Sequence, residues 1–142
     1  MSGKKVIGVD YGLKRIGLSL SDDTATIAFP YKYIPNNGTP EVIKNLKKII
    51  LDENIGVVLV GVPSGLKGRE SSVSLKVKEF IKELRDEIGF LAGIVTFDER
   101  FSSVQARKSL INLNVKRKRR KEIIDSVAST LILQSYLDKN KK

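Results

Sequence analysis

The sequence predicts an α/β fold in which helices cover both faces of a mixed five-stranded sheet. Two observations support this prediction. The chain opens with two strand-like segments, residues 5–10 and 15–21, joined by a short turn that contains glycine. From residue 39 onward, segments with helical periodicity alternate with strand-like apolar runs, which is typical of sheets with crossover helices.

The first three predicted strands form an antiparallel unit. Residues 5–10 and 15–21 pair as a hairpin, and Asp22-Asp23 marks the next turn. Residues 27–34 are mixed apolar and aromatic, which favours a third strand. Pro30 weakens this assignment, because proline cannot donate a hydrogen bond to a neighbouring strand. A loop rich in proline and asparagine follows at residues 35–40.

A helix and a buried strand come next. We expect the helix to begin with Thr39 as its N-cap and Pro40 at its first helical position. Its apolar residues recur at helical spacing, at Val42, Ile43, Leu46, Ile49 and Ile50. Residues 55–62 are almost continuously apolar, which is typical of a strand buried on both faces.

The second half of the chain repeats this alternation. A helix is indicated by the apolar positions Val73, Val77, Phe80, Ile81 and Leu84, and Gly89 fits its C-terminal end. Residues 91–97 predict another buried strand, residues 104–110 a helix, and residues 123–137 a final helix. Because no long linker or internal repeat interrupts this order, residues 1–142 predict a single domain.

The composition excludes several classes of protein. The chain has no cysteine and no histidine, so disulfides, zinc–thiolate sites and Ser-His-Asp triads are absent. Hydrophobic residues make up 41%, which suffices for a core. No apolar stretch approaches the roughly 20 residues of a membrane helix, and the N-terminus lacks a signal-peptide pattern. We therefore expect a soluble, cytoplasmic protein without a membrane partner.

The positive charge is concentrated near the C-terminus. The formal net charge is +10, and residues 101–142 contribute +8 of it. This segment contains six consecutive cations, Lys116, Arg117, Lys118, Arg119, Arg120 and Lys121. Such a run is typical of contacts to a phosphate backbone, although it can also form a solvated surface loop. A nucleic acid is the expected partner, ahead of an anionic membrane.

Acidic residues at three places in the sequence are candidates for a metal site. Asp10 and the pair Asp98-Glu99 each follow an apolar strand, and Asp125 lies in an otherwise apolar helix. Carboxylates bind hard divalent cations. Each acid also has a structural explanation. Asp10 can cap a turn, and Asp98-Glu99 can form a solvated turn. Asp125 can be stabilised by the helix dipole in the first turn of its helix. Because side chains alternate along a strand, Asp98 and Glu99 cannot both face one site.

Four motifs together resemble those of the YqgF/RuvX family. They are Gly8-Val9-Asp10-Tyr11-Gly12 with Arg15-Ile16-Gly17, Val60-Gly61-Val62-Pro63 with Gly68, Asp98-Glu99-Arg100-Phe101-Ser102, and Asp125-Ser126-Val127-Ala128 leading into Ile132-Leu133-Gln134. The likeness covers nearly the whole chain. Ser103 and Ser129 depart from the threonine and alanine that the family pattern implies.

The resemblance implies a fold, a site and an activity. Members of this family are described as Holliday junction resolvases and as pre-16S ribosomal RNA nucleases, with an RNase H-like fold. It implies that Asp10, Glu99 and Asp125 are catalytic and metal-binding, so it selects Glu99 over Asp98. It also implies supporting contacts of Arg15 and Arg100 with the substrate.

We therefore expect a metal-dependent endonuclease that acts in 5′-end maturation of pre-16S ribosomal RNA. One or two Mg²⁺ or Mn²⁺ ions would assist hydrolysis of the phosphodiester bond. The expected substrate is structured RNA, with pre-ribosomal particles as partners, and the chain acts as a monomer or homodimer. Two alternatives remain open at this point. They are cleavage of four-way DNA junctions, and nucleic-acid binding or assembly without catalysis on the same fold.

Overall fold

The structure, a computed structural model, describes residues 5–62, 72–98 and 129–139. Its elements are β1 (Lys5–Asp10), β2 (Arg15–Ser21), β3 (Ala28–Pro35), α1 (Thr39–Glu53), β4 (Ile55–Val62), α2 (Ser72–Ile88) and β5 (Gly93–Asp98). Residues 129–139 are helical, which confirms the described part of the final helix predicted over residues 123–137 and extends two residues beyond its predicted end. The helix predicted over residues 104–110 lies outside the described residues.

Five strands form one mixed sheet in the order β3-β2-β1-β4-β5. The pairs β1–β2 and β2–β3 are antiparallel, and the pairs β1–β4 and β4–β5 are parallel. The predicted hairpin and the predicted mixed α/β sheet are therefore confirmed. Because β1 and β4 are parallel neighbours, both strands end at the same edge of the sheet.

The third strand contains Pro30 because β3 lies at the edge of the sheet and carries a β-bulge. Leu18 pairs with Lys32 but Ser19 pairs with Pro30, so Tyr31 has no partner of its own on β2. A bulge on an edge strand is a position where the missing N–H of proline costs little. The strand runs from Ala28 to Pro35, one residue later than predicted.

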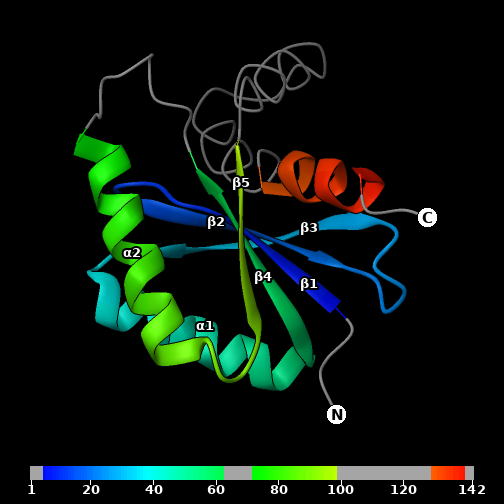
Figure 1. Cartoon of the computed structure of the whole chain (residues 1–142), viewed down its shortest axis with the longest axis horizontal. Helices are drawn as coiled ribbons and strands as arrows, with labels where there is room; N and C mark the ends of the chain where they lie inside the picture. The colour runs from blue at the N-terminus through cyan, green and yellow to red at the C-terminus, as the bar shows by residue number, and fades with distance from the viewer. Residues whose placement is uncertain (1–4, 63–71, 99–128, 140–142) are drawn as a thin grey trace.

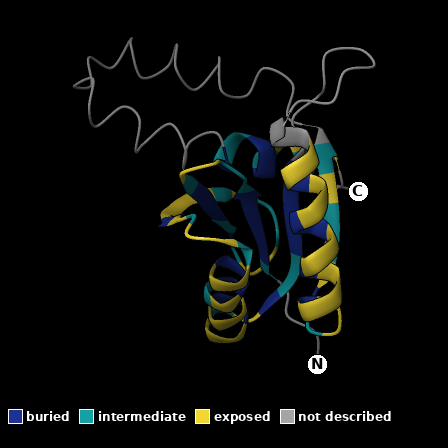
Figure 2. Ribbon diagram, turned by 90° about the vertical axis from the view of Figure 1, so that its left-hand side faces the viewer, coloured by how far each residue is buried: buried dark blue, intermediate teal, exposed yellow. Residues whose placement is uncertain are grey.

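Helices cover both faces of the sheet, as predicted. Helices α1 and α2 lie on one face, and helix 129–139 (orange to red) lies on the other (Figure 1). In Figure 2, both α1 and α2 turn exposed residues outward and buried residues toward the sheet. The alternation of β1 follows these layers, because Ile7 and Val9 pack beneath α1 and α2, whereas Val6 packs against helix 129–139.

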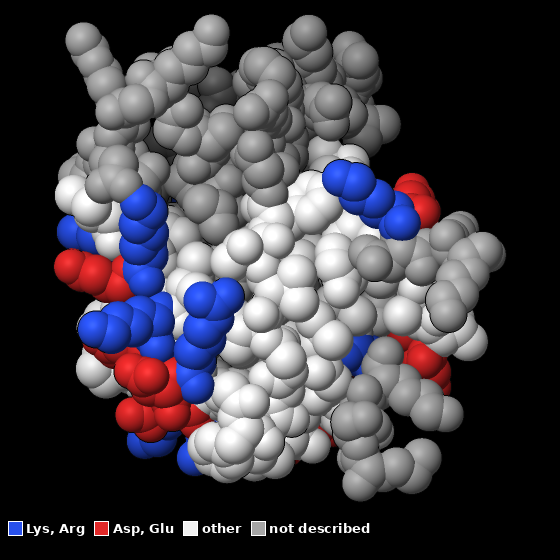
Figure 3. Space-filling model, in the orientation of Figure 1, with Lys and Arg blue, Asp and Glu red and all other residues white. Residues whose placement is uncertain are grey.

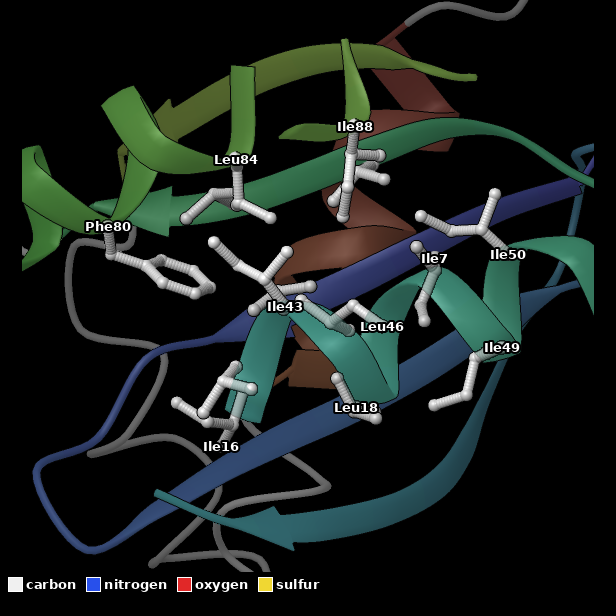
Figure 4. Close-up of a cluster of buried hydrophobic side chains, with 14 of the residues drawn as sticks. Ile7, Ile16, Leu18, Ile43, Leu46, Ile49, Ile50, Phe80, Leu84 and Ile88 are labelled. Carbon is white, nitrogen blue, oxygen red and sulfur yellow. The ribbon is translucent and has the colours of Figure 1, made fainter. Parts of the chain in front are cut away.

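The core beneath α1 and α2 is built mainly from aliphatic side chains of these two helices and of the strands below them, with the ring of Phe80 among them (Figure 4). Ile7, Ile16 and Leu18 rise from β1 and β2, and all three are fully buried. The five apolar positions predicted for the first helix, Val42, Ile43, Leu46, Ile49 and Ile50, are all buried. In β4, Val58, Leu59 and Val60 are fully buried on alternating faces, so the prediction of a doubly buried strand is confirmed.

The predicted start of the first helix is wrong by one residue. Gly38 is the N-cap, Thr39 is already helical, and no side chain caps the helix. Gly38 has a φ of 117°, which residues other than glycine rarely adopt, and its carbonyl accepts the first helical bond from Val42 at 3.1 Å. The predicted end of the second helix is confirmed, since the N–H of Gly89 donates to the carbonyl of Arg85 at 3.1 Å.

A strand is present in the range predicted at residues 91–97, but the prediction that it is buried is wrong. β5 begins at Gly93 and lies at the sheet edge opposite β3. Ile94, Val95 and Phe97 are only half-buried, and Thr96 is exposed. An edge strand has a neighbour on one side only, so an apolar sequence there does not guarantee full burial.

Candidate functional site

Asp10 is the last residue of the central strand β1 and is half-buried. Alternation places it on the face of Val6 and Gly8, which is the face covered by helix 129–139. Its partner on β2 is Gly17 and its partner on β4 is Gly61. Neither neighbour adds a side chain beside the carboxylate. Glycine on both sides leaves the immediate surroundings of Asp10 to groups contributed by other segments.

Helix 129–139 approaches β1 closely at Gly8. A Cβ added at Gly8 would lie 3.1 Å from the Ser129 hydroxyl oxygen and 3.2 Å from the Leu133 Cβ. The Ser129 hydroxyl is fully within the interface and shares a 2.8 Å hydrogen bond with the Ser19 hydroxyl of β2. Ser129, where the family pattern implies alanine, therefore links this helix to the hairpin.

The helix runs antiparallel to β1. Leu133 and Leu137 pack in one cluster with Val6, near the start of β1, whereas Ser129 lies at Gly8, two residues further along the strand. Moving from residue 137 back to residue 129 thus follows β1 toward Asp10. In its middle the helix is anchored to the start of β3 and the connection before it, because Gln134 accepts from the Ala28 N–H at 2.8 Å and donates to the Thr26 carbonyl at 3.0 Å.

Strand β5 presents alternate residues to the same face as Asp10. Val95 and Phe97 pack against the cluster beneath helix 129–139, whereas Ile94 packs against the cluster on the opposite face. Phe97 is level with Asp10 in the sheet, because both pair with Gly61 of the strand between them. Phe97 also meets the ring of Tyr136 edge-on, with centroids 6.5 Å apart.

The structure describes two of the predicted site residues, Asp10 and Arg15. The others lie outside the described residues, namely Glu99, Asp125, Arg100, Lys116, Arg117, Lys118, Arg119, Arg120 and Lys121. Within residues 5–62, 72–98 and 129–139, no three acidic side chains gather closely enough to hold a metal ion. Since only one of the three predicted ligands falls in those ranges, the predicted metal site is untested by this observation.

Arg15 contacts an aromatic side chain that the sequence did not single out. Its guanidinium carbon lies 5.5 Å from the centroid of the Tyr33 ring, a cation–π contact between β2 and the edge strand β3. Tyr33 is 39% exposed, and Phe29 and Tyr31 on the same strand are also exposed. The sequence shows that aromatic residues recur at positions 29, 31 and 33, but their exposure became visible only in the structure.

Charged residues are unevenly placed on the described surface. Figure 3 shows lysine and arginine side chains along the side of the molecule formed by α2, interspersed with aspartate and glutamate side chains. A hollow of about 410 Å³ there is lined by Lys78, Ile81, Lys82, Arg85, Asp86 and Thr96. It lies on the face of the sheet covered by α2, opposite to the face of Asp10.

In the described ranges no helix is long and apolar enough to cross a bilayer.

The turn after β2 is built around Asp22. Its carboxylate accepts hydrogen bonds from the Ile27 N–H at 2.9 Å, from the Thr24 hydroxyl, and from the Thr26 N–H at 2.7 Å. These bonds, led by the one from Ile27, hold the pKa of Asp22 well below its usual range. The confirmed Asp22-Asp23 turn therefore has a structural role at the edge of the sheet remote from Asp10.

Comparison with known proteins relates the chain to one family. Residues 4–139 match the model of a family described as "RuvX: Holliday junction resolvase". A protein of Sulfurihydrogenibium sp. named "Putative pre-16S rRNA nuclease" is 38% identical over 95% of this chain and 90% of its own. A protein of the same name from Thermoanaerobacter pseudethanolicus is 35% identical over 96% of this chain and 98% of its own.

Solved structures of low sequence identity share the fold. Thermus thermophilus RuvC in complex with a Holliday junction substrate superposes with a TM-score of 0.61 at 12% identity, covering 95% of this chain and 94% of that one. The Fowlpox virus resolvase with Holliday junction DNA gives a TM-score of 0.58 at 17% identity, covering 97% and 99%. The sheet and its covering helices therefore form the RNase H-like arrangement that the sequence resemblance implies.

Proposed function

The chain belongs to the RuvX family, and from this premise we propose that it is a metal-dependent nuclease acting in 5′-end maturation of pre-16S ribosomal RNA. The names of its full-length relatives support the reaction and the RNA substrate. The excess of positive charge supports a nucleic acid partner, since residues 101–142 alone carry a net charge of +8.

We propose that Asp10, Glu99 and Asp125 are the catalytic carboxylates. The observation that carries this proposal is the alternation along β5. Val95 and Phe97 face the side of the sheet on which Asp10 lies, and Phe97 is level with Asp10. If this alternation continues past Phe97, Glu99 would face the same side of the sheet as Val95, Phe97 and Asp10, and Asp98 would face the other side. This supports the choice of Glu99 over Asp98 as the second carboxylate.

The contact between Ser129 and Gly8 supports the proposed role of Asp125. If the helix extends back from Ser129 as the sequence predicts, Asp125 would lie on the same stripe, one turn or about 6 Å closer to its start. Asp10 lies two residues beyond Gly8 in the same direction, about 7 Å along β1. The two displacements match, which supports convergence of Asp125 and Asp10. This assignment depends on the helix predicted from the sequence over residues 123–137.

Carboxylate oxygens fit Mg²⁺ or Mn²⁺, and the chain offers no histidine or cysteine that would favour zinc. The glycines that pair with Asp10 add no side chains beside its carboxylate, which is compatible with a hydrated ion there. A bound ion would neutralise phosphate charge and lower the pKa of water. Asp10, Glu99 and Asp125 would bind and orient it. Arg15, Arg100 and residues 116–121 would bind the nucleic acid backbone.

Four-way DNA junctions are the second candidate substrate, favoured by the description of the matching family. Cutting a junction requires two paired cuts, which favours a symmetric homodimer, whereas cutting one RNA strand is compatible with a monomer. A non-catalytic nucleic-acid-binding module is the third candidate. It would bind either substrate and cut neither.

The test is cleavage of precursor small-subunit RNA and of a four-way DNA junction, each with and without Mg²⁺ or Mn²⁺. We expect metal-dependent cutting of the RNA at the 5′ side of the mature sequence. Asp10→Asn abolishes cutting but retains RNA binding. Asp23→Asn is the matched control, because Asp23 is an exposed turn residue paired only loosely with Lys5 at 3.8 Å. Undiminished metal-dependent cutting by Asp10→Asn would refute the assignment.

A further inference from the structure

We propose that Tyr33, with Arg15 against its ring, is a stacking platform for an unpaired base of the nucleic acid strand held at Asp10. This inference rests on the proposed nuclease function and specifies its substrate class. The strand would be unpaired next to the cut, instead of lying within a continuous duplex.

The sheet register places Tyr33 in line with Asp10. Asp10 pairs with Gly17 of β2, and Gly17 pairs in turn with Tyr33 of β3. Tyr33 is thus two strands away, roughly 10 Å at the usual strand spacing. Ser19, two residues from Gly17, bonds to Ser129 of the covering helix, so this row faces the same side of the sheet as Asp10. Gly17 contributes no side chain between the two.

Tyr33 is not part of the core. The neighbouring residue Ile34 is buried among the apolar side chains beneath α1, while Tyr33 is 39% exposed. The Arg15 guanidinium lies 5.5 Å from its ring centroid and restricts its orientation. Exposed cation–π contacts stabilise a fold only weakly, so this contact alone does not account for a tyrosine on an edge strand.

The chemistry of the pair fits a nucleotide. Unpaired bases stack on aromatic rings and on the flat guanidinium group of arginine, with little dependence on sequence. Arg15 also carries a charge that attracts the adjoining phosphate, and the exposed Lys14 precedes it in the turn. A stacked strand advances about 3.4 Å per nucleotide, so the platform lies within about three nucleotides of the phosphate at Asp10.

The test is a binding scan with single-stranded precursor RNA in EDTA, so that cutting does not contribute. One base at a time is replaced by an abasic nucleotide, and the affinity is measured by fluorescence anisotropy for the full-length chain. DNA of the same sequence forms a second arm, which separates recognition of bases from recognition of RNA. The variants are Tyr33→Ala, Tyr33→Phe and Tyr31→Ala.

Tyr31→Ala is the matched control. Tyr31 is 37% exposed on the same strand and also carries a cation, Lys32, over its ring at 5.1 Å. It lines a hollow beside Lys5 and Asp22, at the end of the sheet away from Asp10. Thermal unfolding of every variant separates a loss of contact from a loss of fold.

We expect Tyr33→Ala to weaken binding about 5- to 100-fold, the range measured for stacked bases. Tyr33→Phe and Tyr31→Ala bind within about twofold of the wild type. At one or two positions, removing the base weakens the wild type by about the same factor and leaves Tyr33→Ala unaffected. The proposal is overturned if Tyr33→Ala binds like the wild type, if its abasic profile is unchanged, or if the wild type binds only four-way junction DNA.

These outcomes are distinguishable from failure of the nuclease assignment. Coupling between Tyr33 and one base, without metal-dependent cutting in the separate cleavage assay, would reject the nuclease and keep the platform. Cutting that depends on Asp10 without such coupling would reject the platform and keep the nuclease.

Discussion

Replacing Gly8 with alanine tests the contact that holds helix 129–139 against the sheet. The added Cβ would lie 2.3 Å from the Ser19 hydroxyl oxygen, closer than real Cβ atoms approach other atoms. Ser19 is fully buried and bonded to Ser129 at 2.8 Å, so its hydroxyl cannot rotate away without losing that bond. Leu133, at 3.2 Å from the new atom, also restricts the helix.

The expected destabilisation combines two effects. Overpacking a well-packed interior costs about 1–3 kcal/mol. Loss of the hydrogen bond between Ser19 and Ser129 adds about 1 kcal/mol. We therefore expect Gly8→Ala to lower the free energy of unfolding by about 2–4 kcal/mol. For a chain of 142 residues this lowers Tm by roughly 6–15 °C.

Urea denaturation followed by circular dichroism measures this change. Gly93→Ala is the control, because it adds the same methyl group to a strand glycine whose nearest contact is the Gly56 carbonyl at 3.9 Å. We expect Gly93→Ala to change the free energy by less than about 1 kcal/mol. If Gly8→Ala is as stable as Gly93→Ala, the helix does not pack on β1 as described, and the placement of Asp125 loses its support.

Three further predictions concern other parts of the chain. Because hydrogen bonds lower the folded-state pKa of Asp22, it stabilises the fold above its unfolded value of about 3.9, so the Tm difference between wild type and Asp22→Ala should shrink as the pH falls below about 4. Gln134→Ala leaves the Ala28 N–H and the Thr26 carbonyl without their partner, which should cost about 1–3 kcal/mol in urea denaturation. Neutralising three of the cations in Lys116–Lys121 should reduce the slope of log affinity against log salt by about 0.7 for each lost phosphate contact on single-stranded RNA.

The order and type of the elements followed from the sequence because periodicity and turn residues agreed. The hairpin of β1 and β2 has the predicted bounds, and the apolar stripe of α1 is buried throughout. The errors occurred where tertiary context decided. Gly38 rather than Thr39 caps α1 because its φ is positive, and β5 is only half-buried because it forms an edge.

The site was less accessible from sequence. A single aspartate after a strand is compatible with a turn, and only the register reveals that Asp10 has glycine on both sides. From the sequence, only the family resemblance selected Glu99 over Asp98, and the structural support for the proposed choice required knowing which face Val95 and Phe97 occupy. Tyr33 was not singled out because the aromatic residues of the third strand were recognised in the sequence, whereas their exposure was not.

Direct measurement of Mn²⁺ binding tests the central claim, which is that Asp10, Glu99 and Asp125 converge on one ion. Electron paramagnetic resonance titration counts free Mn²⁺ in the presence of the wild type and of Asp10→Asn, Glu99→Gln, Asp125→Asn and Asp98→Asn. We predict that the first three substitutions weaken binding about tenfold or more, and that Asp98→Asn leaves it unchanged. Binding that survives all three, or that is lost with Asp98→Asn and kept with Glu99→Gln, would contradict the account.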